Sequence, residues 1–191
     1  MEDRPNAGLY RNIQIAFALI TVLWLIYAIN IVLPADLRCY GLKPRRTDGL
    51  PGIVLAPLLH ASFRHLTGNS GPLFVLLVVS LTLSRSMTLA ALFLITVLGG
   101  GGVWLFGTAG TVHVGASGLI FGLLGFTICI GIFQRRWKPL IFSLIVFFAY
   151  GGVLMSLFIH MPGVSWSSHF WGFISGVLAA WWLRKADIRH G

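Results

Sequence analysis

Three groups of polar side chains lie in or beside long apolar stretches of this sequence, where a hydrogen-bonding group needs a partner or a function. The first group contains His60, His65 and Asn69. His65 and Asn69 are four residues apart and would share one face of a helix, whereas His60 would point about 140° away from His65 if that helix were continuous. We therefore expect His65 and Asn69 to act as a pair.

The second group is Gly115-Ala116-Ser117-Gly118, at the expected start of an apolar helix. A serine in the first turn lies where backbone N–H groups are unpaired and the helix dipole is positive, so an oxyanion forming there would be stabilised. Gly118 and Gly122 begin a smooth strip along which another helix can approach closely. Gly-x-Ser-Gly alone is a weak signal, and Leu119 distinguishes it from the Gly-x-Ser-x-Gly elbow of soluble hydrolases.

The third group contains His169, Gly172 and Gly176, which share one helix face. If this face packs on the Gly118 strip, the His169 imidazole and the Ser117 hydroxyl come together as a general base and a nucleophile. Every Asp and Glu lies outside the apolar stretches, so the imidazole has no carboxylate to orient it as in a Ser-His-Asp triad. We expect Phe121, one turn below Ser117, to hold the His169 ring by stacking.

Donors from the first group complete this site. His65 and Asn69 enter the same side of the membrane as Ser117, so their N–H groups and the Ser117 backbone N–H are placed to bind an oxyanion. Such a set of groups performs acyl transfer and needs no metal or cofactor.

The composition indicates what must position these residues. Of 191 residues, 57% are hydrophobic and 10% are charged, whereas soluble domains carry about 25% charged residues. The chain is therefore expected to be an integral membrane protein rather than a soluble or disordered one. Its net charge of +9 does not indicate nucleic-acid binding, because the cations lie between apolar runs without interleaved aromatic residues.

Helical spans of about 20 apolar residues are needed to cross a bilayer. The sequence predicts an all-α, polytopic membrane protein with six transmembrane helices in a single domain, residues 1–191. The predicted spans are 13–33, 66–83, 87–106, 115–133, 140–159 and 166–183.

Charge asymmetry predicts the orientation of these spans. If they are crossed in turn, nine Lys or Arg residues fall on the side of both termini and five on the side of the first loop, residues 34–57. By the positive-inside rule both termini are cytoplasmic. We expect a multi-pass protein of the cell membrane, with Ser117 and His169 near the outer surface.

Taken together, His60-x4-His65-x3-Asn69, Gly115-Ala-Ser117-Gly118 and His169-x2-Gly172-x3-Gly176 resemble, in order and spacing, the motifs of the rhomboid intramembrane serine proteases. The resemblance covers helices two, four and six of a six-helix core. It implies that Ser117 is the nucleophile and His169 the general base, and that His65, Asn69 and the Ser117 N–H form the oxyanion hole. His60 matches the structural first histidine, and Gly115 and Gly118 match the glycines that flank the nucleophile.

Two positions depart from the family pattern. Phe121 falls where many rhomboids have a tyrosine, so the ring is kept and the hydroxyl is lost. The Trp-Arg pair that many members carry in the first loop is absent. The resemblance implies an intramembrane serine endopeptidase that cleaves other membrane proteins, whose transmembrane helix enters laterally from the lipid bilayer and unwinds.

Other classes of function fit parts of the pattern. A rhomboid-like protein that binds membrane clients without cutting them is one alternative, although both dyad residues are retained. A haem protein with two histidine ligands is another, and a Soret band would reveal it. His113 and His160, in loops beside the spans, are expected to be solvated, and the glycines at 99–102 are expected to permit a close helix crossing or a kink.

Overall fold

The computed structural model describes residues 7–135, 137, 140, 141, 144, 145, 148 and 165–185. Within these residues every regular element is helical, as expected of a chain that must satisfy its backbone hydrogen bonds internally in lipid. The long helices are α1 (Ala7–Val32), α3 (Phe63–Leu83), α4 (Arg85–Leu94), α5 (Gly100–Phe106), α6 (Ser117–Phe133) and α9 (Trp166–Leu183). A π-helical turn, η4 (Ile95–Gly99), joins α4 to α5 in one continuous rod.

Three of the described helices are long and apolar enough to cross a membrane: 7–32, 63–83 and the rod 85–106. Helices α6 and α9 have 17 and 18 residues and correspond to the fourth and sixth predicted spans. The fifth predicted span, 140–159, lies largely outside the described residues, and the count of six spans therefore stays a prediction. The helical architecture and the apolar helices identify an integral membrane protein.

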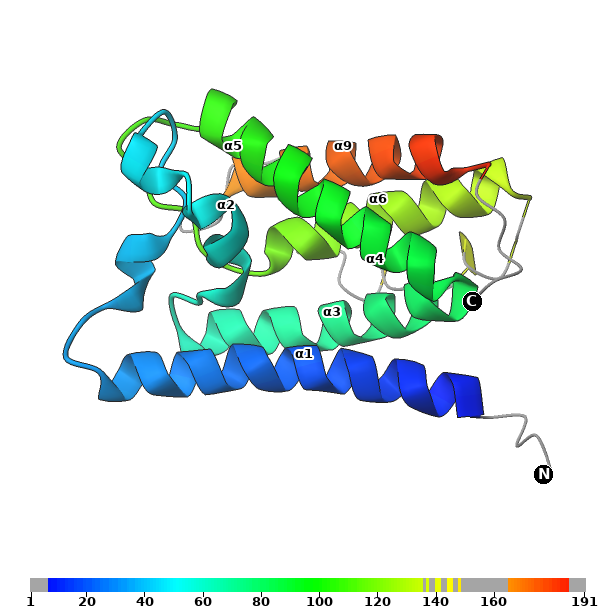
Figure 1. The fold of residues 1–191 in the computed structure, drawn as a ribbon, viewed down its shortest axis with the longest axis horizontal. Helices are drawn as coiled ribbons and strands as arrows, with labels where there is room; N and C mark the ends of the chain where they lie inside the picture. Colours follow the sequence, from blue (N-terminus) through cyan, green and yellow to red (C-terminus); the bar gives the residue numbers. More distant parts are fainter. Residues whose placement is uncertain are drawn as a thin grey trace.

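Helices α3, α6 and α9 begin at the same end of the molecule and run in the same direction (Figure 1). Their facing sides form the core, and α6 is buried on nearly all sides. Helix α1 lies along the edge of this group and packs mainly on α3, with only Asn12, Ala16 and Leu23 buried. The three helices that carry the predicted site residues therefore form the inner part of the molecule.

Serine side chains cap the starts of α3, α4 and α9, whereas α6 begins without a side-chain cap. The Ser62 hydroxyl accepts a hydrogen bond from the His65 N–H at 3.1 Å at the start of α3, and Ser165 accepts one from the Ser168 N–H at 3.2 Å at the start of α9. Ser84 ends α3 and caps α4 by accepting from the Met87 N–H at 3.4 Å. Each cap satisfies one backbone donor that a helix start leaves open.

The first loop folds over the end of the molecule where α3, α6 and α9 begin (Figure 1). It contains short turns, η1 (Leu37–Tyr40), η2 (Thr47–Gly49), α2 (Gly52–Leu55) and η3 (Ala56–Leu58). The Trp104 indole donates to the Arg46 carbonyl at 2.8 Å, and the Leu42 backbone pairs with that of His113 at 3.0 and 2.9 Å. This loop is therefore attached to both the rod and the segment before α6.

Ion pairs stabilise the loop surface. Asp48 accepts from Arg46 at 2.8 Å and from Lys43 at 3.0 Å, and these two cations hold the pKa of Asp48 well below its usual range. Asp36, like Asp48, forms an ion pair with a neighbouring cation.

Candidate active site

Ser117 is the first residue of α6 and is buried, with 7% of its surface exposed. The preceding Gly115 has φ +116°, a backbone conformation that strongly favours glycine. A Cβ atom at Gly115 would lie 2.5 Å from the His65 ring, so glycine is also required by the close approach of this loop to α3. The Gly115 N–H donates to the Ala56 carbonyl at 2.8 Å, which connects the segment before Ser117 to the first loop.

Backbone contact between glycines joins α6 to α9. A Cβ atom at Gly172 would overlap the Gly118 carbonyl, and one at Gly176 would overlap the Gly122 carbonyl. The sequence predicted this packing, and it is present. Because the two contacts follow one another in the same order along both helices, α6 and α9 run parallel, and Ser117 and His169 lie at the same end of the shared interface, which we call the glycine seam.

The His169 ring is held by aromatic packing. It stacks on Phe121 with ring centroids 4.2 Å apart and an interplanar angle of 26°, as predicted, and it is 3% exposed. No Asp or Glu occurs anywhere in the sequence of α3, α6 or α9. Packing therefore supplies part of the orientation that a carboxylate supplies in soluble serine hydrolases.

Asn69 contributes an unpartnered donor near the segment that leads into Ser117. Its buried Nδ2 has no hydrogen-bond partner and lies 3.5 Å from where a Cβ atom of Gly115 would be. Buried polar groups are nearly always hydrogen-bonded, and an exception calls for an explanation, of which a catalytic role is one. The His65 ring touches the same glycine, so the predicted pair meets the segment that precedes Ser117.

His60 does not point away from His65, because α3 begins at Phe63 and the helix that would have rotated it is not continuous. Instead the His60 and His65 rings are 5.2 Å apart, and His60 Nε2 accepts from the Ala116 N–H at 3.4 Å. Burial, aided by the nearby His65, lowers the pKa of His60 to about 4, so the ring is neutral at neutral pH and can accept this bond. Its placement fits a supporting role.

His113 was expected to be solvated, and this expectation is wrong. The residue is 8% exposed, and both ring nitrogens have hydrogen-bond partners. Its backbone pairing with Leu42 turns the side chain inward, and no pattern in the sequence signals that pairing. His160 lies outside the described residues.

Within the glycines at 99–102, Gly99 and Gly102 permit a close helix crossing, one of the two outcomes predicted for this run. A Cβ atom at Gly102 would lie 2.5 Å from the Trp171 ring of α9, and one at Gly99 would lie 3.0 Å from the Ser175 hydroxyl. The π-helical turn η4 ends at Gly99 and widens the rod where α9 packs against it.

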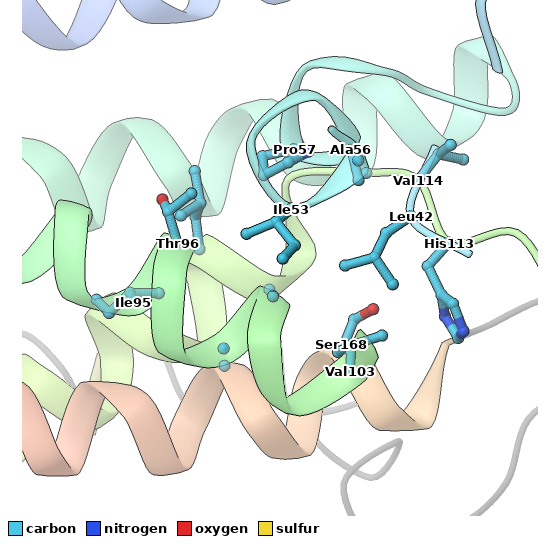
Figure 2. Close-up of a pocket in the computed structure, with 17 residues that line it drawn as sticks. Leu42, Ile53, Ala56, Pro57, Ile95, Thr96, Val103, His113, Val114 and Ser168 are labelled. Atoms are coloured by element: carbon cyan, nitrogen blue, oxygen red, sulfur yellow. The ribbon is translucent and has the colours of Figure 1, made fainter. Parts of the chain in front are cut away.

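A cavity of about 40 Å³ borders Gly115 and Gly118, on either side of Ser117 in the sequence. Figure 2 shows that it lies between the first loop, the rod and the start of α9, with Ile53, His113 and Ser168 around it. Ligand pockets are usually about 300–1,000 Å³, so this cavity is too small for a peptide segment.

The arrangement as a whole combines a helix-start serine, a buried imidazole on the facing helix and an unpaired amide donor. These are the groups that acyl transfer needs: a nucleophile, a base and an oxyanion donor.

Comparison with known proteins identifies a family. A family model described as "Rhomboid domain" matches residues 48–186. An uncharacterized protein of Mycobacterium tuberculosis (strain H37Rv) is 40% identical over 179 residues, which cover 88% of this chain and 73% of that protein. A protein of Bacillus subtilis (strain 168), named "Putative rhomboid protease", is 33% identical over 197 residues, which cover 95% of this chain and 94% of that protein.

Proposed function

The chain belongs to the rhomboid family, whose members are usually intramembrane serine proteases, and on that premise we propose that it is a serine endopeptidase that cleaves membrane proteins in or near their transmembrane segments. Ser117 is the proposed nucleophile and His169 the proposed general base.

The observation that carries the proposal is the glycine seam. Gly172 lies against Gly118, so the helix that begins with Ser117 and the helix that presents His169 meet backbone to backbone. The stacking of Phe121 on His169, 4.2 Å between centroids, then fixes the base on the side of α9 that faces α6. Two side chains that must exchange a proton need this proximity, because a general base acts within about 2.6–3.2 Å.

In the proposed reaction the Ser117 hydroxyl oxygen attacks a substrate carbonyl carbon while His169 accepts the hydroxyl proton. The imidazolium returns that proton to the leaving amine, and an acyl-enzyme on Ser117 remains. His169 then takes a proton from a water whose oxygen attacks the acyl carbon. The bond from that carbon to the Ser117 oxygen breaks, the imidazolium returns its proton to this oxygen, and the new carboxyl group is released.

Asn69 is the proposed donor to the oxyanion. Its Nδ2 is buried and lacks a partner, so a negatively charged oxygen beside Gly115 would satisfy it. A donor with no ground-state partner stabilises charge that appears only in the transition state. His65 and the Ser117 backbone N–H are the further proposed donors.

The proposed substrates are proteins with a transmembrane helix that reaches the site from the lipid bilayer. A helix hides its carbonyl groups in hydrogen bonds, so it must unwind before Ser117 can attack. We propose that both termini are cytoplasmic in the cell membrane, which places the first loop and the site at the outer face. The five cations of that face, against nine on the other, support this orientation.

The test is covalent labelling of the purified protein by a fluorophosphonate, together with cleavage of a model transmembrane substrate. Wild-type protein should be labelled and should cleave the substrate. Ser117→Ala and His169→Ala should be neither labelled nor active in cleavage. Ser80→Ala is the matched control, because this buried hydroxyl on α3 bonds Thr127 at 3.1 Å, away from the site, and its loss should leave labelling intact. Full cleavage by Ser117→Ala refutes the dyad, and client binding by an unreactive wild type would favour the non-cutting alternative.

A further inference from the structure

His113 connects three segments that surround the proposed site. Its backbone pairs with Leu42 of the first loop, and it lies four residues before Ser117. Its Nδ1 lies 2.5 Å from the hydroxyl of Ser165, the residue that caps α9. The proposed reaction does not use His113, so its burial and its contacts need another explanation.

The direction of each hydrogen bond follows from the number of hydrogens available. The Thr111 hydroxyl donates its one hydrogen to the Thr108 carbonyl at 2.6 Å. Its contact with His113 Nε2 at 2.9 Å must therefore be one in which Nε2–H donates and the threonine oxygen accepts. In a neutral ring this leaves Nδ1 as an acceptor, and the Ser165 hydroxyl donates to it.

The Ser165 oxygen in turn accepts hydrogen bonds from α9. Because the Ser165 hydroxyl donates its one hydrogen to His113, the Ser168 hydroxyl must be the donor in its 2.7 Å contact with the Ser165 oxygen. The Ser168 backbone N–H donates to the same oxygen at 3.2 Å. The Ser165 carbonyl also accepts from the His169 N–H at 3.2 Å. The first turn of α9, up to His169, is thus hydrogen-bonded to the residue that His113 holds.

We propose that His113 is a positioning residue: by accepting the Ser165 hydroxyl hydrogen on Nδ1, it fixes the first turn of α9, and with it His169, relative to the segment that leads into Ser117. The effect of this placement on catalysis rests on the proposed protease function. The placement of His169 itself is independent of that function.

The environment favours the required form of the ring. Burial lowers the pKa of His113 from its ordinary value, so the neutral imidazole that can accept on Nδ1 predominates at neutral pH.

Two substitutions test the roles of the two His113 ring nitrogens separately. His113→Asn keeps a polar atom at the position of Nδ1 and can still accept from Ser165, whereas His113→Gln keeps one at the position of Nε2 and loses Ser165. We expect His113→Asn to retain fluorophosphonate labelling and kcat within about threefold. His113→Gln should lower both by about 10- to 100-fold with an unchanged KM, since small displacements of a catalytic group have effects of this size.

Ser165→Ala and Thr111→Val are the matched partners. Ser165→Ala should reproduce His113→Gln, and Thr111→Val should reproduce His113→Asn. Thermal unfolding in detergent monitors the fold of each variant. Equal activity of the Asn and Gln variants, or losses that only follow the unfolding midpoint, would overturn the proposal.

A second measurement does not depend on activity. In protein with ¹⁵N-labelled histidine, the imidazole nitrogens of His169 should shift in His113→Gln and Ser165→Ala and keep their wild-type positions in His113→Asn. Unchanged His169 signals in all variants would overturn the positioning role. If wild-type protein fails to react with the fluorophosphonate, the protease proposal falls, and the His169 signals still decide whether His113 positions that residue.

Discussion

Helices α6 and α9 meet through backbone, whereas α1 and α3 meet through side chains. At the glycine seam, Gly172 and Gly176 lie against main-chain carbonyls of α6. Between α1 and α3, the Trp24 indole donates to the Ser70 hydroxyl at 3.1 Å and the Asn12 amide donates to Thr82 at 3.3 Å. Most of α1 is exposed.

Under the proposed function, this difference separates a contact that positions the reacting side chains from one that holds a helix in place. Backbone carbonyls cannot change rotamer, so a glycine contact determines the distance between two helices closely. Side-chain contacts can adjust to a substitution by changing rotamers. Residues that must meet within hydrogen-bonding distance are therefore expected at the first kind of interface.

The largest effect is expected from filling the glycine seam. Gly172→Leu should abolish substrate cleavage, because its side chain would have to displace α6 by more than the reaction tolerates. The smaller Gly172→Ala should lower kcat by about 100-fold and also lower the unfolding midpoint. Gly101→Ala is the control, because a Cβ atom there meets nothing within 4 Å. A structure of Gly172→Leu with the wild-type helix spacing would contradict this account.

Two buried asparagines, one near the proposed site and one on α1, test whether the site determines activity while the contact between α1 and α3 contributes only to stability. Asn69→Ala should lower kcat by about 10- to 1000-fold through the lost oxyanion donor, with little change in unfolding. Asn12→Ala should lower stability and leave kcat unchanged. Asn12 accepts from the Arg85 guanidinium at 2.7 Å, and its removal leaves that guanidinium with only its bond to the Gly8 carbonyl at 3.0 Å. The expected loss is about 1–3 kcal/mol of unfolding free energy with normal kcat. An unchanged rate in Asn69→Ala would remove it from the site.

A smaller effect is expected from Phe121, the ring that stacks on the proposed base His169. Phe121→Leu should lower kcat by about 2- to 10-fold, since a stacked pair contributes about 0.5–1.5 kcal/mol beyond its area. Phe121→Tyr should keep wild-type activity. The control is Phe126→Leu, an equally buried ring on α6 that should lower stability and leave kcat unchanged. Equal kcat losses in both leucine variants would show that the stacking has no special role.

The smallest effect is expected on the α1 side. Trp24→Phe removes the indole donor to Ser70 and keeps most of the apolar surface, so unfolding should change by about 1 kcal/mol or less and kcat should not change. Cleavage kinetics and thermal unfolding in the same detergent measure both. A kcat that falls more than about threefold would mean that α1 also positions the site.

Much of this molecule was predictable from sequence because lipid restricts the backbone to a few solutions. Apolar length predicted α3, α6 and α9 to within a few residues, and the glycine spacing predicted which faces meet. The sequence did not predict that Ser62 caps α3 and that the helix begins at Phe63. The prediction that His60 turns away from His65 assumed a continuous helix, and that condition is not met.

What the sequence alone determined is the position of α3, α6 and α9, their small-residue faces and the residue types where these helices begin, because periodicity and side-chain size act locally. The tertiary structure decided that the first loop pairs with His113, that this ring is buried against Ser165, and that a π-helical turn fits the rod to α9. Those outcomes depend on contacts between segments far apart in the chain. The packing of the helices determines which polar groups come within hydrogen-bonding distance of each other.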